Sequence, residues 1–262
     1  MSSSIASLYA DFEPEILVAS DGPVRIVTLN RPEDLNAVNH RLHAAFAAIW
    51  RRLANDPDAK AVVLTGAGRA FCAGGDLDWF AEIATDATLR ASVIAEAREI
   101  VLEMSRFPLP VVAAINGPAM GLGCSISILC DLVYMADHAF LADPHVAVGI
   151  VAGDGGAAAW PLLTSLLRAK EYVFTGDRIP AAEAERFGLV NHVVPLESLM
   201  PDALAMAHRL AGLPTFALRA TKRAFNIHLD RAICGVLDHA LAAESESFLT
   251  DEHRERMLAL RK

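Results

Sequence analysis

The chain has 262 residues, enough for one large domain with a substantial core, and 53% of them are hydrophobic. No uncharged apolar run approaches the roughly 18 residues that a membrane-spanning helix needs, which argues against insertion into a membrane. The formal net charge of −9 disfavours a nucleic-acid partner, because a phosphate backbone requires a clustered basic face.

The first segment, residues 1–15, lacks the pattern of a secretory signal. It has no basic stretch followed by an apolar one, and acids appear at Asp11 and Glu13. We therefore expect a cytoplasmic protein. The cysteines, Cys72, Cys124, Cys130 and Cys234, show no C-x-x-C spacing and lie in apolar or glycine-rich segments. Reduced, structural thiols are the expectation for such a set.

Paired strands and a helix are predicted next. Residues 16–19 and 24–29 are apolar or alternating, and a turn with Asp-Gly-Pro at 21–23 separates them. The segment 39–55 has apolar residues at helical spacing, namely Leu42, Phe46, Ile49, Trp50 and Leu53. This spacing predicts an amphipathic helix.

Two further strands each lead into a glycine-rich turn. Strand 61–65 precedes Phe71-Cys72-Ala73-Gly74-Gly75-Asp76-Leu77, and strand 111–115 precedes the turn at 116–124, which reads NGPAMGLGC. Such turns present backbone N–H groups with little side-chain bulk around them. We interpret them as the two halves of an oxyanion hole, which suits chemistry through an enolate.

Helices become dominant along the rest of the chain. Helical patterns at 86–106 and 125–130 flank the second turn, and short strands follow at 132–135 and 190–194. The tail, 200–262, reads as helices broken at 212–214 and near Asp230. This order predicts an α/β core over 1–199 with a C-terminal helical region, 200–262, that does not fold independently. The amphipathic tail packs either on a neighbouring subunit or on its own core.

These motifs, in this order, resemble the crotonase superfamily of enoyl-CoA hydratases and isomerases. Besides the two turns, the resemblance is carried by Asn30-Arg31-Pro32, Leu35-Asn36-Ala37, Leu64-Thr65-Gly66, Cys130-Asp131, Gly155-Gly156, Thr175-Gly176 and Gly188-Leu189-Val190. It implies a spiral of ββα units with a C-terminal helical oligomerisation region, assembled as a homotrimer or a dimer of trimers. It also implies an acyl-CoA substrate, with coenzyme A as part of that substrate, no tightly bound cofactor and no metal.

The resemblance also implies where the ligand is held. The thioester carbonyl would lie between the backbone N–H groups of Gly75 and Leu122. The adenine and pantetheine contacts would fall on Leu35, Ala37, Ala73, Gly74 and Leu77. Asp76 would anchor its turn. Trp79 and Phe80 directly follow the first turn, so they either line an acyl pocket or belong to the core.

The expected catalytic carboxylates are absent. Hydratases of this family carry two glutamates at positions that here read Ser125 and His145. His145 and Asp154 can replace them as a general base, because an imidazole accepts a proton near pH 7 and a carboxylate fixes its tautomer. The pair resembles that of a β-diketone hydrolase branch of the superfamily, which cleaves carbon–carbon bonds by a retro-Claisen step.

Three functions therefore stay open: a lyase or isomerase acting on acyl-CoA, a hydrolase that cleaves a β-keto or cyclic diketone-type substrate, and an acyl-CoA binder without turnover. A serine hydrolase is disfavoured because Ser125 lacks the G-x-S-x-G elbow. His40 and His43 lack the further ligands of a metal site, so we interpret them as surface residues. Whether Ser125 or Glu244 takes part in the chemistry stays open.

Overall fold

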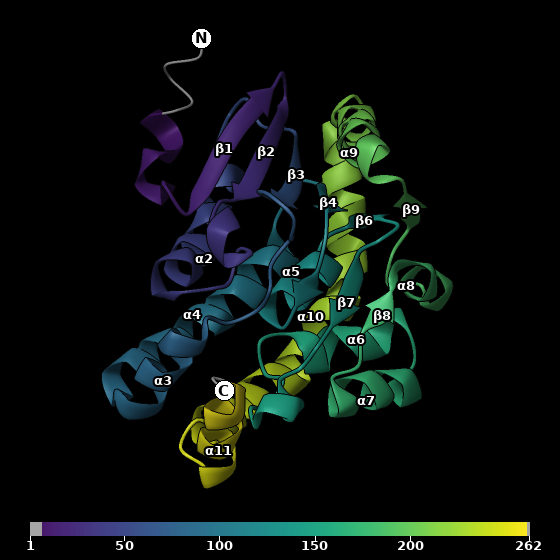
Figure 1. Cartoon of the computed structure of the whole chain (residues 1–262). Coiled ribbons are helices and arrows are strands. Elements are labelled where there is room, and N and C mark those ends of the chain that lie inside the picture. Colours follow the sequence, from purple (N-terminus) through teal and green to yellow (C-terminus); the bar gives the residue numbers. More distant parts are fainter. Residues whose placement is uncertain (1–6, 261–262) are drawn as a thin grey trace.

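The computed structural model describes residues 7–260, and within them six strands form a central sheet in the order β1-β2-β3-β4-β6-β9 (Figure 1). The structure does not describe residues 1–6, which belong to the N-terminal segment considered above as a possible secretory signal, or residues 261–262 of the tail. The strands are β1 Ile16–Asp21, β2 Val24–Leu29, β3 Ala61–Gly66, β4 Val111–Ile115, β6 Leu132–Ala136 and β9 His192–Val194. β1 is antiparallel to β2, and the other neighbours are parallel.

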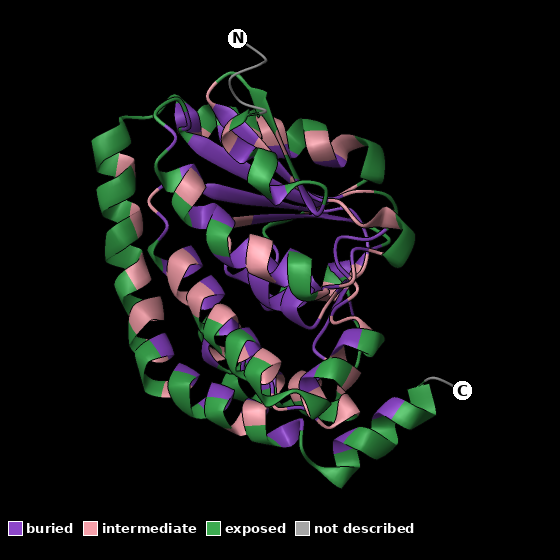
Figure 2. Cartoon of the chain, turned by 90° about the vertical axis from the view of Figure 1, so that its left-hand side faces the viewer, coloured by how far each residue is buried: buried purple, intermediate pink, exposed green. Residues whose placement is uncertain are grey.

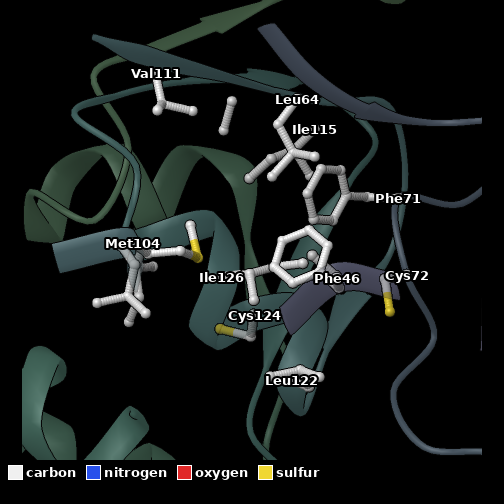
Figure 3. Close-up of a cluster of buried hydrophobic side chains, with 14 of the residues drawn as sticks. Phe46, Leu64, Phe71, Cys72, Met104, Val111, Ile115, Leu122, Cys124 and Ile126 are labelled. Carbon is white, nitrogen blue, oxygen red and sulfur yellow. The ribbon is translucent and has the colours of Figure 1, made fainter. Parts of the chain in front are cut away.

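The parallel strands are apolar because both faces of the sheet are covered. β3 and β4 are buried along their whole length, as expected of strands between two layers. Helix α9, Leu196–Ala211, packs on β2, β3, β4 and β6. On the inner side, Leu64 and Ile115 point into one cluster with Phe71 and with Ile126 from the second turn's helix (Figure 3).

A small second sheet holds the two glycine turns together. It contains β5 Ala119–Met120, β7 Phe140–Ala142 and β8 Ile179–Pro180. An isolated bridge joins Cys72 in the first turn to Ala119 in β5, and the Met120 N–H donates to the Cys72 carbonyl over 2.8 Å. The two turns, about 45 residues apart in the sequence, are therefore side by side in the fold.

The helices of the core begin where local sequence provides a cap or a turn. They are α2 His40–Ala54, α3 Leu77–Thr85, α4 Ala87–Arg106 and α5 Leu122–Ile128, with short 3-10 helices η1 Ala10–Phe12, η2 Pro32–Asp34 and η3 Val146–Val148. Asp76 caps α3, accepting from the N–H of Asp78 over 3.0 Å. The sequence prediction missed α3 and started α5 three residues late, because both begin inside the glycine turns.

The C-terminal helices wrap the lower part of the molecule (Figure 1). They are α6 Gly156–Leu163, α7 Leu166–Thr175, α8 Ala181–Phe187, α10 Thr215–Ser247 and α11 Asp251–Leu260. The predicted break near Asp230 is wrong. No proline interrupts α10 there, and the Asp230 carboxylate accepts from Arg223 over 2.7 Å and from Ser105 over 3.2 Å. The interruption falls instead at 248–250, between α10 and α11.

The long helix α10 divides into two parts by burial. Its second half packs against α4 and α6 of the same chain and buries Ile233, Leu237 and Leu241. Its first half leaves Phe216 86% and Phe225 71% exposed, and Figure 2 shows one side of this helix exposed over most of its length. The tail thus packs partly on its own core.

The structure describes all four cysteines, and each is free. Cys72 and Cys124 are buried and Cys130 is half-buried, as expected of core thiols. Cys234 is also free but exposed, on α10, so the expectation of a structural thiol does not hold for it. Within residues 7–260 no helix is long and apolar enough to cross a membrane.

Candidate active site

The two glycine turns meet in space, and Gly75 from the first and Leu122 from the second line the same cavity. Gly121 has φ +51° and ψ −124°, a conformation that residues with a side chain rarely adopt, and a Cβ there would lie 3.6 Å from the Gly74 Cα. Leu122 is the first residue of α5, so its N–H has no partner within the helix. Within residues 7–260 neither the Leu122 N–H nor the Gly75 N–H donates to a backbone carbonyl.

Most of the predicted coenzyme A contacts form one strip beside Gly75. The Ala73 N–H donates to the Leu35 carbonyl over 3.0 Å, and the Val38 N–H donates to the Gly74 carbonyl over 2.7 Å. These bonds bring Leu35 and Ala37 against Ala73 and Gly74. Leu77, at the start of α3, is partly exposed at the end of the strip. Trp79, the candidate for an acyl pocket, and Ser125, whose part the sequence left open, lie apart from this strip and are buried.

His145 stands between two buried carboxylates. Its Nδ1 lies 2.6 Å from Asp143 Oδ1, and its Nε2 lies 3.3 Å from Asp154 Oδ2. The Ser125 hydroxyl donates to Asp154 Oδ1 over 2.8 Å. Burial alone would lower the pKa of His145, but the charges of Asp154 and Asp143 raise that pKa well above its usual range. Burial raises the pKa of Asp154, yet His145 and Ser125 hold it below its ordinary value.

This arrangement changes the role expected of His145. The sequence interpretation had one ring nitrogen accept a proton from water while Asp154 held the other. In the structure both nitrogens face carboxylates, and Asp143 occupies Nδ1. Sequence reasoning missed Asp143, although its place two residues before His145 was the available signal. Asp154 does not cap the following helix, because Gly155 is the N-cap of α6 and no side chain caps it.

Glu244 on α10 adds a third carboxyl group to the site. It is buried, and among the described residues its Oε2 has no hydrogen-bond partner. Burial, followed by the charge of Asp154, raises the pKa of Glu244 to about 8. Gly153 leaves room for this carboxyl, because a Cβ at Gly153 would collide with Oε2. Glu244 therefore carries a proton at neutral pH, and the sequence alone had named it without placing it.

A second imidazole–carboxylate pair, His43 with Glu96, lies close to these residues. The interpretation of His43 as a surface residue is wrong, since it is 3% exposed and its Nδ1 lies 2.6 Å from Glu96 Oε2 on α4. Its ring centroid lies 5.3 Å from that of Trp79. The signal was present in the sequence, because His43 shares helical spacing with Phe46 and Trp50 on the buried face of α2.

One small cavity of about 40 Å³ connects these residues. The residues that line it include Gly75, Leu122, His145, Asp154 and Glu244, together with His43, Trp79 and Phe80. The Phe80 ring packs on Gly75, in the space that a Cβ of residue 75 would fill. Phe80 also contacts the rings of Phe248 and His253, with centroids 5.8 Å and 6.3 Å away. The cavity thus has room for only a few water molecules.

Within residues 7–260 no group of three or more His, Cys, Asp or Glu side chains is arranged to hold a metal ion. The imidazoles of the cavity instead pair with carboxylates: His145 with Asp143 and Asp154, and His43 with Glu96. The cavity therefore brings the two glycine turns together with one carboxyl group of lowered pKa, Asp154, and one of raised pKa, Glu244.

Comparison with known proteins gives a consistent result. A family model described as enoyl-CoA hydratase/isomerase matches residues 20–260. The short-chain-enoyl-CoA hydratase of Clostridium acetobutylicum is 33% identical, over 93% of each chain. A solved enoyl-CoA hydratase/isomerase from Mycobacterium paratuberculosis is 54% identical with a TM-score of 0.91, covering 94% of this chain and 98% of that one.

A solved β-diketone hydrolase is also similar. It comes from the cyanobacterium Anabaena, was solved bound to an oxocyclohexyl acetic acid, and is 25% identical to this chain with a TM-score of 0.85. The match covers 97% of this chain and 98% of that one.

Proposed function

The chain belongs to the enoyl-CoA hydratase/isomerase family, and from this premise we propose that it processes an acyl-CoA thioester through an enolate in the cavity that contains His145. One observation supports the proposal: Gly75 and Leu122, whose N–H groups donate to no backbone carbonyl within residues 7–260, line the same cavity as the titratable side chains. Backbone donors cannot titrate, and each well-placed donor contributes about 3 to 4 kcal/mol when negative charge develops on the thioester oxygen.

Proton transfer follows from the opposite pKa shifts of two carboxyl groups. Asp154, whose pKa is held low, stays ionised and accepts a proton, whereas Glu244, with a pKa of about 8, carries one to donate. His145 is an imidazolium that keeps Asp154 ionised and fixes its position. His145 and Asp154 thus form the acid–base centre in place of two glutamates, and Glu244 completes it.

Substrate entry requires Phe80 to move. The ring covers Gly75, and a cavity of about 40 Å³ is too small for an acyl group. The strip formed by Leu35, Ala37, Ala73, Gly74 and Leu77 would hold the coenzyme A portion outside. Displacement of Phe80 by the thioester would uncover the Gly75 N–H and admit the acyl chain.

Hydrolytic carbon–carbon cleavage is the second candidate, supported by the likeness to the Anabaena β-diketone hydrolase. In that reaction Asp154 would take a proton from water as the water oxygen attacks a ketone carbon. The carbon–carbon bond then breaks, the electron pair leaves as an enolate, and Glu244 protonates the enolate carbon. A binder without turnover is the third candidate.

The test is product analysis with an enoyl-CoA and a β-ketoacyl-CoA, using the unaltered protein and Asp154→Asn. A hydrated or isomerised product supports the first proposal, and two shorter acyl products support hydrolysis. If both thioesters bind saturably and neither gives a new species, the third candidate, a binder without turnover, is supported. In the enzymatic cases Asp154→Asn should bind both thioesters and lose turnover.

We further propose a homotrimer or a dimer of trimers in the cytoplasm. The exposed Phe216 and Phe225 on α10 support an apolar subunit interface. Four free thiols suit a reducing compartment. Sedimentation analysis at several concentrations would distinguish the trimer from the hexamer, and a monomer at all concentrations would contradict both.

A further inference from the structure

His43 and Trp79 form a polar wall of the cavity, and Glu96 lies behind His43. His43 lines the cavity from α2, and Glu96 holds its Nδ1 from the neighbouring helix α4. Glu96 Oε1 in turn accepts from the Ser92 hydroxyl over 3.0 Å. The imidazole is therefore fixed in one orientation by a carboxylate that is itself held in place.

This wall has hydrogen-bonding capacity that the protein does not use. Nδ1 of His43 is engaged by Glu96, so Nε2 is the ring atom that remains for a ligand. Trp79, in contact with His43, is 6% exposed, and among the described residues its Nε1–H has no partner. Buried polar groups without partners are rare, and each is costly unless a bound molecule satisfies it.

The chemistry of the wall selects among acyl groups. A plain hydrocarbon chain would cover these polar groups and leave them without partners. A carboxylate in this small cavity would lie near the ionised Asp154, which lines it, and near Glu96, which holds His43, and these like charges would repel it. A neutral oxygen can accept from the Trp79 N–H and also bond to the imidazole.

We infer that His43, positioned by Glu96, is a specificity-determining residue that binds a neutral oxygen substituent, a hydroxyl or ketone, on the acyl group of the thioester. This inference rests on the proposed binding of acyl-CoA. It adds that the substrates are oxygenated acyl groups, and that their oxygen is recognised by the side chains of His43 and Trp79 rather than by the backbone donors at Gly75 and Leu122.

Binding measurements with saturated thioesters test the inference without depending on the reaction. The probes are pentanoyl-CoA, its isostere with a hydroxyl in place of the terminal methyl, and its isostere with a ketone in place of the adjacent methylene. The unaltered protein should bind at least one oxygenated probe about 10- to 100-fold more tightly than pentanoyl-CoA. His43→Phe should remove this preference while changing the dissociation constant of pentanoyl-CoA by less than about 3-fold.

Matched variants separate recognition from a structural role. His40→Phe makes the same change on an exposed residue one turn earlier on α2, and should keep the full preference. His43→Gln retains a hydrogen-bonding group and should keep part of the preference for the oxygenated probe. Glu96→Gln should reduce it, because the imidazole loses its fixed orientation.

Two results would overturn the inference. One is equal binding of all three probes by the unaltered protein, and the other is equal weakening of all three by His43→Phe, which indicates a structural pair only. If the unaltered protein bound none of the thioesters, the proposed function itself would fail, and the inference with it.

Discussion

Replacing Glu244 by Gln should stabilise the protein, and increasingly so as the pH rises. Glu244 is buried with an unpartnered Oε2, and its pKa is raised from an ordinary 4.5 to about 8. Glutamine has nearly the same shape as the protonated carboxyl but never ionises. The substitution therefore removes the cost of keeping this carboxyl neutral, or of ionising it inside the cavity.

The sign and size follow from proton linkage. Below pH 4.5 the carboxyl is protonated in both the folded and the unfolded chain, so its ionisation does not affect stability. Between pH 4.5 and about 8 the unfolded chain ionises and the folded one does not, so stability falls as the pH rises. At about 1.4 kcal/mol per pKa unit, the cost is about 3 kcal/mol at pH 7 and at most about 5 kcal/mol above pH 8.

Urea unfolding at about pH 5, 7 and 9, at one protein concentration, measures this difference. The free energy of unfolding of Glu244→Gln should exceed that of the unaltered protein by under about 1 kcal/mol at pH 5, about 3 kcal/mol at pH 7 and about 5 kcal/mol at pH 9. Because the pKa of His145 is raised in the folded protein, this residue also contributes stability, which is fully present below about pH 6.5 and is lost at higher pH. Both proteins contain His145, so both share this contribution. Glu246→Gln, an exposed neighbour on α10, is the control and should show no such gain. A difference that is independent of pH would refute the reasoning.

Three further predictions concern neighbouring residues. Asp154→Asn should lower turnover at least about 100-fold while acyl-CoA still binds within a few-fold; steady-state kinetics with titration checks this, and unchanged turnover would exclude Asp154 as the base. His145→Ala should cost about 3 to 5 kcal/mol of unfolding free energy, because Asp143 and Asp154 lose the cation between them; a loss under about 1 kcal/mol in urea unfolding would contradict an imidazolium there. Asp76→Ala should cost about 1 kcal/mol by removing the cap of α3, and unchanged thermal and urea stability would contradict that role.

The sheet was predictable because burial on both faces makes its strands continuous apolar runs. Strands 61–65 and 111–115 match β3 and β4 closely for that reason. The start of α3 was not visible, because its cap, Asp76, lies inside a glycine turn that reads as a loop. The continuity of α10 through Asp230 was also not visible, because it depends on partners, Arg223 and Ser105, that only the fold brings together.

The site was predictable only where a motif is local. The glycine turns and the nearness of His145 to Asp154 follow from short segments. Glu244 and His43 reach the cavity from helices far apart in the sequence, so their roles depend on tertiary packing. Nothing near Glu244 in the sequence indicates a raised pKa, because the cause is burial and the charge of Asp154, some 90 residues earlier.

The charges in the cavity explain why its carboxyl groups differ. Asp143 and Asp154, both in contact with the His145 imidazolium, leave the trio with one net negative charge. A third carboxylate nearby would add another, so Glu244 keeps its proton. A thioester oxygen that becomes negative between Gly75 and Leu122 would meet the same repulsion. It can form there only if donors offset it, and in the proposed mechanism the two backbone N–H groups and the Glu244 proton are those donors. The proton that electrostatics holds on Glu244 in the free protein would thus be the one that the proposed enolate chemistry requires.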